Sequence, residues 1–161
     1  MSAKLCCFSF GGGGNSVLAQ DTDTTAYTVA LGGGDDFAHL GGGNDFLDAE
    51  TASSAQQAYG NDGDDTMLGG EGFDTFFGEA DNDSLDGGTG GGELYGGFGD
   101  DALTSIGDAD LYGESGNDAF VIQAATTGVL QVFDFVPGED RVEIEFENLA
   151  APPEVTTALA A

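Results

Sequence analysis

Basic residues are almost absent from this 161-residue chain, which contains one lysine, Lys4, and one arginine, Arg141. The chain also carries 30 acidic residues, so its formal net charge at pH 7 is −28. Nucleic acids and anionic lipid surfaces are bound largely through Lys and Arg side chains. We therefore expect neither a nucleic acid nor an anionic membrane as a partner.

Cysteines and long apolar runs are also scarce. Cys6 and Cys7 are the only cysteines, which is too few for a disulfide framework, and their adjacent positions do not suit a zinc site. No apolar run approaches the roughly 18 residues that span a bilayer, so we expect no transmembrane segment. Residues 1–8 show neither the apolar core nor the cleavage site of a secretory signal peptide, and any export signal is expected elsewhere.

Glycine, in contrast, is abundant, with 29 residues, and it recurs in a nine-residue unit. The unit has glycines at positions one, two and four, aspartate at position six and a large apolar residue at position eight, as in segments 69–77 and 96–104. One spacing of 20 residues covers a degenerate unit at 49–59, and a weaker unit at 11–18 suggests that the repeats begin near Phe10. The residues at position eight are Ala38, Leu47, Met67, Phe76, Leu85, Leu94, Leu103, Leu111 and Phe120.

This period predicts a solenoid of short parallel strands. A three-residue strand with only its middle side chain pointing inward cannot fold alone, because its backbone pairs with the strand one coil away. Two units then make one coil of about 18 residues, with a turn and a strand on each side. The predicted fold class is therefore all-β and parallel.

Position six differs between the two sides of this solenoid. One side carries an unbroken aspartate series, whereas the other has Asp36, a degenerate turn, Asp74, Gly92 and then either Ala109 or Asp110. Without metal we expect so acidic and glycine-rich a chain to be disordered, since it cannot bury enough apolar surface to offset the entropy of ordering. Divalent cations would reverse this by cancelling charge and joining several oxygen atoms in one site. The unbroken series is Asp45, Asp65, Asp83, Asp101 and Asp118.

Over residues 32–144 these units resemble the hemolysin-type calcium-binding repeats of RTX proteins. The resemblance implies a parallel β-roll that holds several Ca²⁺ ions between successive turns on one side, bound by turn carbonyls and by aspartate carboxylates of both turns. Asp81 departs from the repeat because it stands where glycine is expected. Carried over to this sequence, the implied metal-site residues are Gly41, Gly43, Asp45, Gly60, Asp62, Gly63, Asp65, Gly78, Asp81, Asp83, Gly96, Gly97, Gly99, Asp101, Gly113, Gly116 and Asp118 on the complete side, with Asp36, Gly72 and Asp74 on the other.

The C-terminal part resembles the strands that close such rolls. Segments 118–121 and 132–144 carry this likeness, and alternating apolar residues on either side of Pro137-Gly138 predict an antiparallel hairpin cap. We divide the chain into an N-terminal segment (1–10), the β-roll (11–122), capping strands (123–149) and a tail (150–161).

The resemblance also implies export. RTX proteins usually leave Gram-negative cells unfolded through a type I exporter that reads an uncleaved C-terminal signal, and the small apolar tail 150–161 is similar to such signals. Extracellular calcium modules have dissociation constants of about 10⁻⁴ to 10⁻³ M, far above cytosolic calcium. The chain is therefore expected to fold only outside the cell.

Candidate catalytic residues are few. His39, the only histidine, falls at position nine of a unit, where the side chain points outward, and we interpret it as a surface residue. Paired carboxylates can hydrolyse glycosides, but here their spacing fits metal coordination better. The chain has no nucleophile elbow, phosphate loop or zinc motif. We expect no catalytic residues and no enzyme activity.

Rings at position nine of the incomplete side form a stripe made of His39, Phe77, Tyr95 and Tyr112. Such a stripe is either cross-strand packing or an interface. Because the repeats begin within about 30 residues of Met1, we expect the roll to be the functional body. Our hypothesis is an extracellular structural or self-assembling surface protein; the alternatives are a monomeric adhesion or ligand-binding module and an accessory that buffers calcium or aids export.

Overall fold

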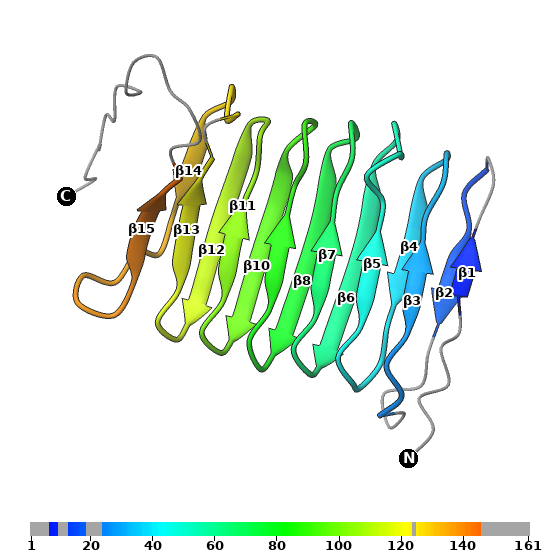
Figure 1. The fold of residues 1–161 in the computed structure, drawn as a ribbon, viewed down its shortest axis with the longest axis horizontal. Coiled ribbons are helices and arrows are strands. Elements are labelled where there is room, and N and C mark those ends of the chain that lie inside the picture. The colour runs from blue at the N-terminus through cyan, green and yellow to red at the C-terminus, as the bar shows by residue number, and fades with distance from the viewer. Residues whose placement is uncertain (1–6, 10–12, 19–23, 124, 146–161) are drawn as a thin grey trace.

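The computed structural model describes residues 7–9, 13–18, 24–123 and 125–145, and all regular elements in these ranges are β-strands. The strands alternate along the chain between two parallel sheets, which we call the odd sheet and the even sheet (Figure 1). The odd sheet comprises β1 (Cys7–Ser9), β3 (Thr28–Ala30), β5 (Phe46–Asp48), β7 (Thr66–Leu68), β9 (Ser84–Asp86), β11 (Ala102–Thr104), β13 (Ala119–Ile122) and β15 (Arg141–Ile144). The even sheet comprises β2 (Ser16–Leu18), β4 (Asp36–His39), β6 (Gln56–Asp62), β8 (Asp74–Ala80), β10 (Gly92–Phe98), β12 (Ala109–Ser115) and β14 (Leu130–Val132).

Each coil of the chain contributes one strand to each sheet, and every ladder between neighbouring strands is parallel. Leu85 of β9 aligns with Leu103 of β11, and Leu94 of β10 aligns with Leu111 of β12. A parallel pair needs a crossover connection, and here the strand of the opposite sheet with its two turns supplies it. The coils stack along the long axis in Figure 1. The predicted all-β parallel roll is confirmed.

The hydrophobic core is a double row of inward side chains between the two sheets. Every residue predicted at position eight is buried, with exposed fractions of 0–2%. Fully burying a Leu or Phe side chain contributes about 1.5–3 kcal/mol, so this row is a large part of the stabilising free energy. A strand has only one such residue, and this is why single coils depend on their neighbours.

The degenerate unit keeps the winding. Ala58 of β6 lies in the core and aligns with Ala38 on one side and Phe76 on the other. The additional residues are taken up in the preceding turn, where the backbone N–H of Ala52 donates to the carbonyl of Ala49 at 2.8 Å. The long spacing is therefore a larger turn and not a break in the sheet.

The odd sheet extends beyond residues 11–122 at both ends, and the even sheet extends beyond this range at its C-terminal end. β1 lies before this range and pairs with β3, while β14 and β15 lie after it. The predicted tail, 150–161, and most of the N-terminal segment, 1–10, fall outside the described residues.

The predicted antiparallel hairpin cap is wrong. β14 pairs in parallel with β12, and β15 pairs in parallel with β13, so the chain completes one more coil. The physical reason is the open edge of each sheet, since β12 and β13 both present backbone groups that require partners. The segment around Pro137 and Gly138 is the turn of this last coil, where the backbone N–H of Asp118 donates to Oδ1 of Asp140 at 3.0 Å.

Candidate metal centre

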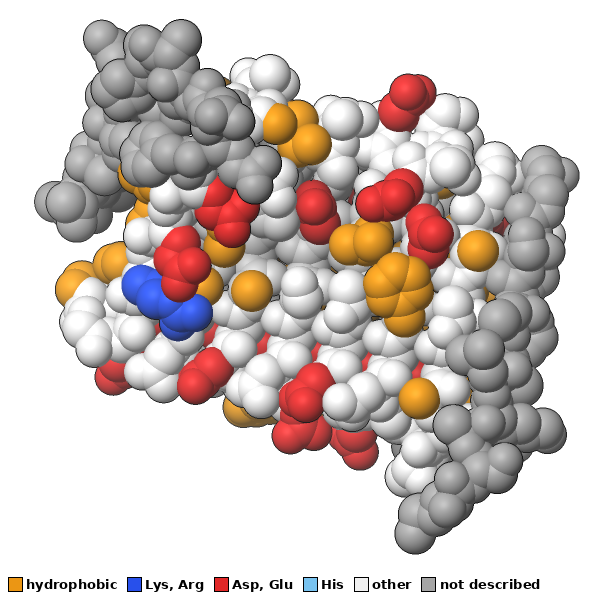
Figure 2. All heavy atoms as spheres, viewed as in Figure 1, with side chains coloured by type: hydrophobic (Ala, Val, Ile, Leu, Met, Phe, Trp, Pro, Cys, Tyr) orange, Lys and Arg blue, Asp and Glu red, His pale blue; other side chains and the backbone are white. Residues whose placement is uncertain are grey.

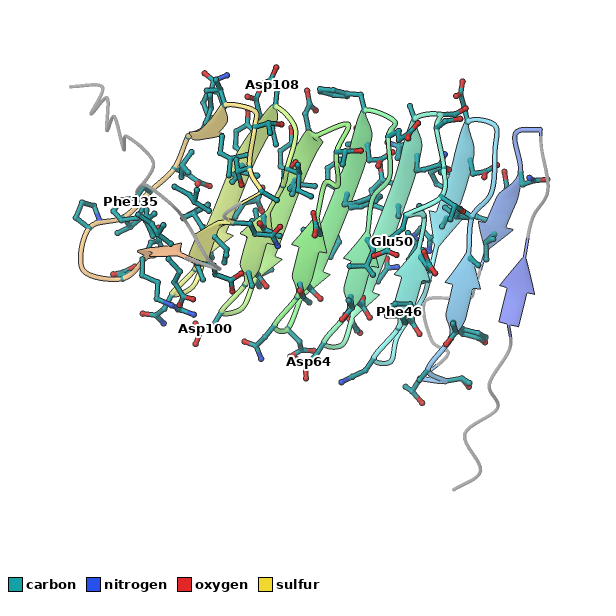
Figure 3. All side chains as sticks on the ribbon, turned by 45° about the horizontal axis from the view of Figure 1, so that its top comes forward. Phe46, Glu50, Asp64, Asp100, Asp108 and Phe135 are labelled. Atoms are coloured by element: carbon teal, nitrogen blue, oxygen red, sulfur yellow. The ribbon has the colours of Figure 1, made fainter. Side chains whose placement is uncertain are left out.

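Two rows of turns form the long edges of the roll. The odd edge contains the turns that lead into the odd strands, and the even edge contains the turns that lead into the even strands. In Figure 3 Asp64 and Asp100 mark the odd edge along the bottom, and Asp108 marks the even edge at the top. The predicted unbroken aspartate series lies entirely on the odd edge, directly before β5, β7, β9, β11 and β13.

The buried aspartates of the odd edge form a hydrogen-bonded ladder. In each step the backbone N–H of one aspartate donates to Oδ1 of the aspartate one coil later. The donor and acceptor are 2.7 Å apart for Asp45 and Asp65, 2.8 Å for Asp65 and Asp83, 2.8 Å for Asp83 and Asp101, and 3.0 Å for Asp101 and Asp118. We call these residues, together with Asp140, the aspartate ladder.

Residues not predicted from the sequence complete the ladder at its two ends. The backbone N–H of Tyr27 donates to Oδ1 of Asp45 at 2.6 Å, and Asp140 accepts from Asp118. Asp140 follows Asp118 by 22 residues, and because this spacing is not a multiple of nine, the repeat pattern did not predict it. Asp134, also missed, accepts from the backbone N–H groups of Gly113 and Glu114 at 3.0 and 2.8 Å.

Three of the ladder carboxylates have a second oxygen without a hydrogen bond. Oδ2 of Asp65, Asp83 and Asp101 is buried and unpartnered within the described part of the chain. A buried charge without a partner is strongly unfavourable. These oxygens therefore require either a proton or a cation.

Glycine lets oxygen atoms of successive coils approach each other closely beside the ladder. A Cβ placed on Gly60, Gly78 or Gly96 would lie 2.1, 2.2 or 2.4 Å from the ladder Oδ2 of the same turn. The same three points lie 2.8, 2.5 and 2.8 Å from the carbonyl oxygens of Gly78, Gly96 and Gly113, one coil later. A carboxylate and a carbonyl from successive coils thus converge on one small space that no side chain can occupy. Ca²⁺ prefers such oxygen ligands at 2.3–2.6 Å, and the residues fit this ion.

Three of the ladder carboxylates, Asp65, Asp83 and Asp101, resist ionisation in the absence of a cation. Burial raises the pKa of Asp65 to about 7, of Asp83 to about 8 and of Asp101 to about 6. Backbone N–H donors oppose this rise, and neighbouring carboxylates such as Asp45 and Asp64 add to it. A divalent cation beside these carboxylates would offset the effect of burial and lower their pKa values, because a nearby positive charge favours the ionised form.

A second, exposed polar column runs beside the ladder at position five, where asparagine and aspartate alternate. Asn82 donates to Oδ1 of Asp64 from its backbone and side chain at 3.0 and 3.2 Å, and Asn117 donates to Asp100 in the same way at 2.9 and 2.9 Å. These hydrogen bonds lower the pKa of both aspartates. This alternation could be read from the sequence but was missed. It places an uncharged asparagine coil between any two aspartates of the column. Its members are Asn44, Asp64, Asn82, Asp100 and Asn117.

Two predicted metal-site aspartates lie outside the ladder. The side chains of Asp62 and Asp81 are exposed, so of the predicted carboxylates on this edge the structure brings only those at position six into the ladder. Asp81, which stands in a glycine position, adopts φ +75°, a conformation that is unfavourable for a residue with a side chain. Six of the predicted turn glycines also have positive φ angles, namely Gly41, Gly43, Gly63, Gly97, Gly99 and Gly116.

The even edge carries only the beginning of a similar ladder. Oδ1 of Asp36 accepts from the backbone N–H of Asn15 at 2.7 Å, Gln56 replaces an aspartate in the degenerate turn, and Oδ1 of Asp74 accepts from the N–H of Gln56 at 2.8 Å. Oδ2 of Asp36 is buried and unpartnered, but Oδ2 of Asp74 accepts from the N–H of Gly70 at 3.1 Å. Predicted Gly72 packs against the carbonyl of the degenerate turn, since its Cβ would lie 2.0 Å from Ser54 O.

Along the rest of the even edge position six has no carboxylate, and hydroxyl groups join neighbouring coils. Position six is Gly92 and then Ala109, which settles the alternative with Asp110. Thr89, Ser105 and Thr126 donate through their hydroxyl groups to turn carbonyls of the preceding coil at 3.3, 3.1 and 3.1 Å. We call these contacts the hydroxyl bridges. Because these contacts are neutral, they need no cation.

The ring stripe on the even sheet is a stack. Neighbouring ring centroids along Tyr59, Phe77, Tyr95, Tyr112 and Phe133 lie 4.6, 4.8, 4.6 and 4.9 Å apart, and the planes differ by 7–11°. His39 continues it at 5.9 Å with a tilted ring. We call these rings the aromatic column. The rings do pack across strands, and their outward position also leaves them available as an interface. Tyr59 and Phe133 were missed because they follow irregular spacings.

No group of three or more His, Cys, Asp or Glu side chains in the described ranges forms a metal cluster by itself. An ion on the odd edge must therefore take backbone carbonyls as well as carboxylates.

The part of the chain that the structure describes also contains no helix long and apolar enough to cross a membrane.

Comparison with known proteins supports a metal role for these turns. Residues 28–51 and 59–92 match the family model of the RTX calcium-binding nonapeptide repeat, in four copies. Repeats of this family bind Ca²⁺, are generally structural rather than catalytic, and are typical of secreted proteins. Neither the curated proteins nor the solved structures contain a match to the chain.

Proposed function

Since this chain is a β-roll that carries RTX calcium-binding nonapeptide repeats, we propose that it folds when calcium binds outside the cell and serves as an extracellular structural or self-assembling surface protein. The observation that carries this proposal is the row of buried, unpartnered Oδ2 atoms at Asp65, Asp83 and Asp101. Within the described residues no basic side chain partners this row. Calcium supplies the missing positive charge when bound.

The ladder residues hold the ions between successive turns of the odd edge. Oδ2 of Asp83, for example, and the carbonyl oxygen of Gly96 in the next coil both face the space beside Gly78. The aspartate thereby joins its own coil to the next through the ion, while its Oδ1 joins the previous coil through a backbone N–H. The predicted turn glycines contribute carbonyl oxygens and the space for the ion. On the even edge we place ions only near Asp36 and Asp74.

Folding and calcium binding are coupled in this proposal. With a formal charge of −28 and a buried row of carboxylates, the apo chain lacks the charge balance that a compact state needs. Each coil is stabilised only by its neighbours, so the ions act at the contacts that decide whether the stack forms. Binding free energy then becomes folding free energy.

Circular dichroism with and without calcium tests the proposal. In chelator we expect a disordered spectrum, and millimolar Ca²⁺ should produce the β signal. Mg²⁺ at the same concentration should be a poor substitute because it demands a tight octahedron and gives up water reluctantly. An apo chain with the complete β signal would contradict calcium-dependent folding.

The extracellular location rests on the affinity range of such sites and on the family's usual setting. Sites with dissociation constants of about 10⁻⁴ to 10⁻³ M stay empty in the cytosol and fill outside. We propose type I export from a Gram-negative cell with residues 150–161 as the signal. Deleting these residues should leave the protein in the cells, and unchanged release into the medium would refute this part.

We propose a non-catalytic role. The buried carboxylates are engaged in the ladder and His39 is only half-buried on the even sheet, where its ring packs beside Tyr59. The surface that favours assembly is the aromatic column, whose rings are partly exposed along the sheet. Monomeric adhesion or ligand binding, and calcium buffering or export assistance, are the alternatives that the assembly measurement in the Discussion separates.

A further inference from the structure

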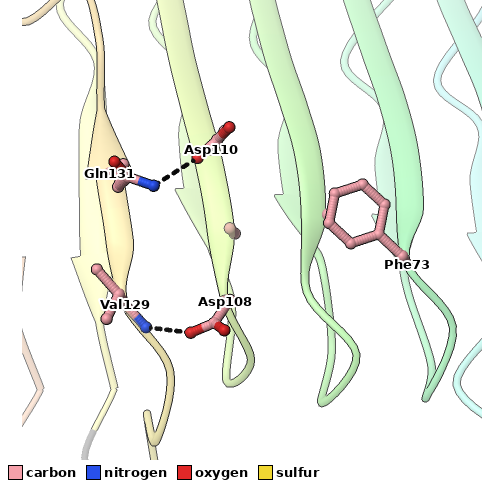
Figure 4. Close-up of a pocket in the computed structure, with 7 residues that line it drawn as sticks. Phe73, Asp108, Asp110, Val129 and Gln131 are labelled. Carbon is pink, nitrogen blue, oxygen red and sulfur yellow. Dashed lines mark hydrogen bonds between the residues drawn. The ribbon is translucent and has the colours of Figure 1, made fainter.

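A shallow groove lies on the even sheet close to the even edge, away from the aspartate ladder (Figure 4). Its volume is about 350 Å³. The residues that line it are Phe73, Gly92, Asp108, Ala109, Asp110, Val129 and Gln131.

The groove exists because one coil has no side chain at this point. Gly91 and Gly92 lie between the coil of Phe73 and the coil of Asp108, and their φ angles are +80° and +148°. A Cβ on Gly91 would lie 1.8 Å from Asp108 O, and a Cβ on Gly92 would lie 1.9 Å from Asp74 O. The backbone packing therefore requires glycine at both positions, and neither position has a side chain that could fill the groove.

The walls of the groove combine apolar surface with oriented carboxylates. Phe73 is 55% exposed on one side and Val129 is 64% exposed on the other. Oδ1 of Asp108 accepts from the backbone N–H of Val129 at 2.7 Å, and Oδ1 of Asp110 accepts from Nε2 of Gln131 at 3.1 Å, as the dashed lines in Figure 4 mark. Each carboxylate is held in place through one oxygen, and its Oδ2 has no hydrogen bond to any described residue.

We propose that this groove binds the guanidinium side chain of an arginine in a basic peptide partner. A planar guanidinium stacks on a phenyl ring such as Phe73 and donates to carboxylates in a fork geometry. The alkyl part of the same side chain suits the apolar wall at Val129. Ca²⁺ is a poorer match, because phenyl and isopropyl groups line this groove where the odd edge offers carbonyl oxygens.

The arginine must come from another molecule. Arg141 is the one basic side chain in the described ranges, and it pairs with Glu143 and donates to the carbonyl of Asn117 at 3.2 Å on the odd sheet. Figure 2 shows a single blue patch on a face with many separate red carboxylates. So negative a surface draws cationic partners from a distance, and the groove supplies the specific contact. This function goes beyond calcium-dependent folding and requires only that the roll be folded.

Titration of the calcium-saturated, ¹⁵N-labelled protein with N-acetyl-arginine amide tests the proposal by NMR. N-acetyl-citrulline amide is the matched probe, since it keeps the shape of arginine without the charge. We expect arginine, and not citrulline, to shift the amide signals of Gly92, Asp108, Asp110 and Gln131 in a saturable manner. The titration contains 0.15 M salt, which screens the general attraction between the acidic protein and the cationic probe beyond about 8 Å.

Paired variants separate the groove from general charge. Asp108→Asn with Asp110→Asn should weaken arginine binding about tenfold, since each loses a charge-assisted contact. Glu50→Gln with Glu139→Gln removes the same net charge from exposed sites elsewhere and should change it less than twofold. Phe73→Ala should weaken binding without altering net charge. Equal weakening by the two pairs, equal binding of citrulline, or shifts confined to the odd edge would each overturn the proposal.

Discussion

The backbone N–H of Asp83 donates to Oδ1 of Asp101 at 2.8 Å, across a sequence separation of 18 residues, while Oδ2 of Asp101 remains buried and unpartnered. One side chain thus joins two coils in two different ways. The hydrogen bond to Oδ1 forms within the protein itself, whereas Oδ2 has no partner until a cation binds. This division of roles explains how the fold can depend on calcium although its backbone pairing is complete without it.

The two edges should respond differently to loss of an aspartate. Asp101→Ala leaves the N–H of Asp83 unsatisfied and removes an oxygen of the ion site, so we expect the calcium concentration at the folding midpoint to rise several-fold. Asp74→Ala removes hydrogen bonds to Gln56 and Gly70 and should lower stability by about 1–3 kcal/mol with a smaller shift of this midpoint. Calcium titrations followed by circular dichroism measure both. Equal shifts of the calcium midpoint in the two variants would contradict the proposal that the odd edge binds more calcium than the even edge.

Gly78→Ala should block one ion site. The new Cβ would lie 2.2 Å from Oδ2 of Asp83 and 2.5 Å from Gly96 O, so we expect fewer bound ions or a loss of calcium affinity of at least tenfold. Gly138→Ala is the control, because Gly138 has φ +100° but open space around it. It should cost about 1–2 kcal/mol through backbone strain alone. Isothermal calorimetry that finds the wild-type number of ions and wild-type affinity in Gly78→Ala would refute the placement of the site.

The period of the sequence predicted the core row and the aspartate ladder because both depend on one repeated distance. Leu85 and Asp83 recur in register, and each coil imposes the same environment on the next. Tyr59, Phe133 and Asp140 were missed because enlarged turns precede them. The direction of β15 could not be read from Val142 and Ile144, since alternation of apolar residues is the same in parallel and antiparallel strands. The hydroxyl bridges also escaped prediction, as a serine at a turn has no signature of its own.

The hydroxyl bridges should stabilise the roll independently of calcium. Ser105→Ala removes the donor to Gly88 O, and we expect a loss of about 1–3 kcal/mol in the free energy of unfolding at saturating calcium. The number of bound ions should not change. Ser84→Ala, on the exposed face of the odd sheet, is the matched control and should stay within about 0.5 kcal/mol of wild type. Urea denaturation and calcium analysis of the dialysed protein give both quantities, and a lost ion in Ser105→Ala would show that the even edge binds metal there.

Acid should partly replace calcium. The pKa values of Asp65, Asp83 and Asp101 are raised in the folded state from 3.8 to about 7, 8 and 6, so the folded apo chain binds more protons than the unfolded chain. The stability contributed by these groups is therefore complete below about pH 4 and is lost as the pH rises through 6 to 8. In chelator we expect more β signal at pH 5 than at pH 8.5, and Asp83→Asn should reduce the difference. Equal signals at both pH values would contradict this linkage.

Assembly is the last expectation, and the aromatic column is its basis. The rings of Tyr95 and Tyr112 stack at 4.6 Å and are only half-buried, so they present a ridge along the even sheet. Calcium should promote association by ordering the sheet that carries this ridge and by neutralising carboxylates that keep protomers apart.

We therefore expect light scattering to show higher-order species in calcium and expanded monomers in chelator. Tyr95→Ser with Tyr112→Ser should still fold in calcium, because the inward row is untouched, yet associate less than wild type. Leu68→Ser, on the odd sheet, is the control and should assemble normally. If the double variant and wild type assemble equally, the contact lies elsewhere on the roll. If calcium yields only a compact monomer at every protein concentration, the structural role fails, and the groove beside Phe73 makes a monomeric binding module the better account.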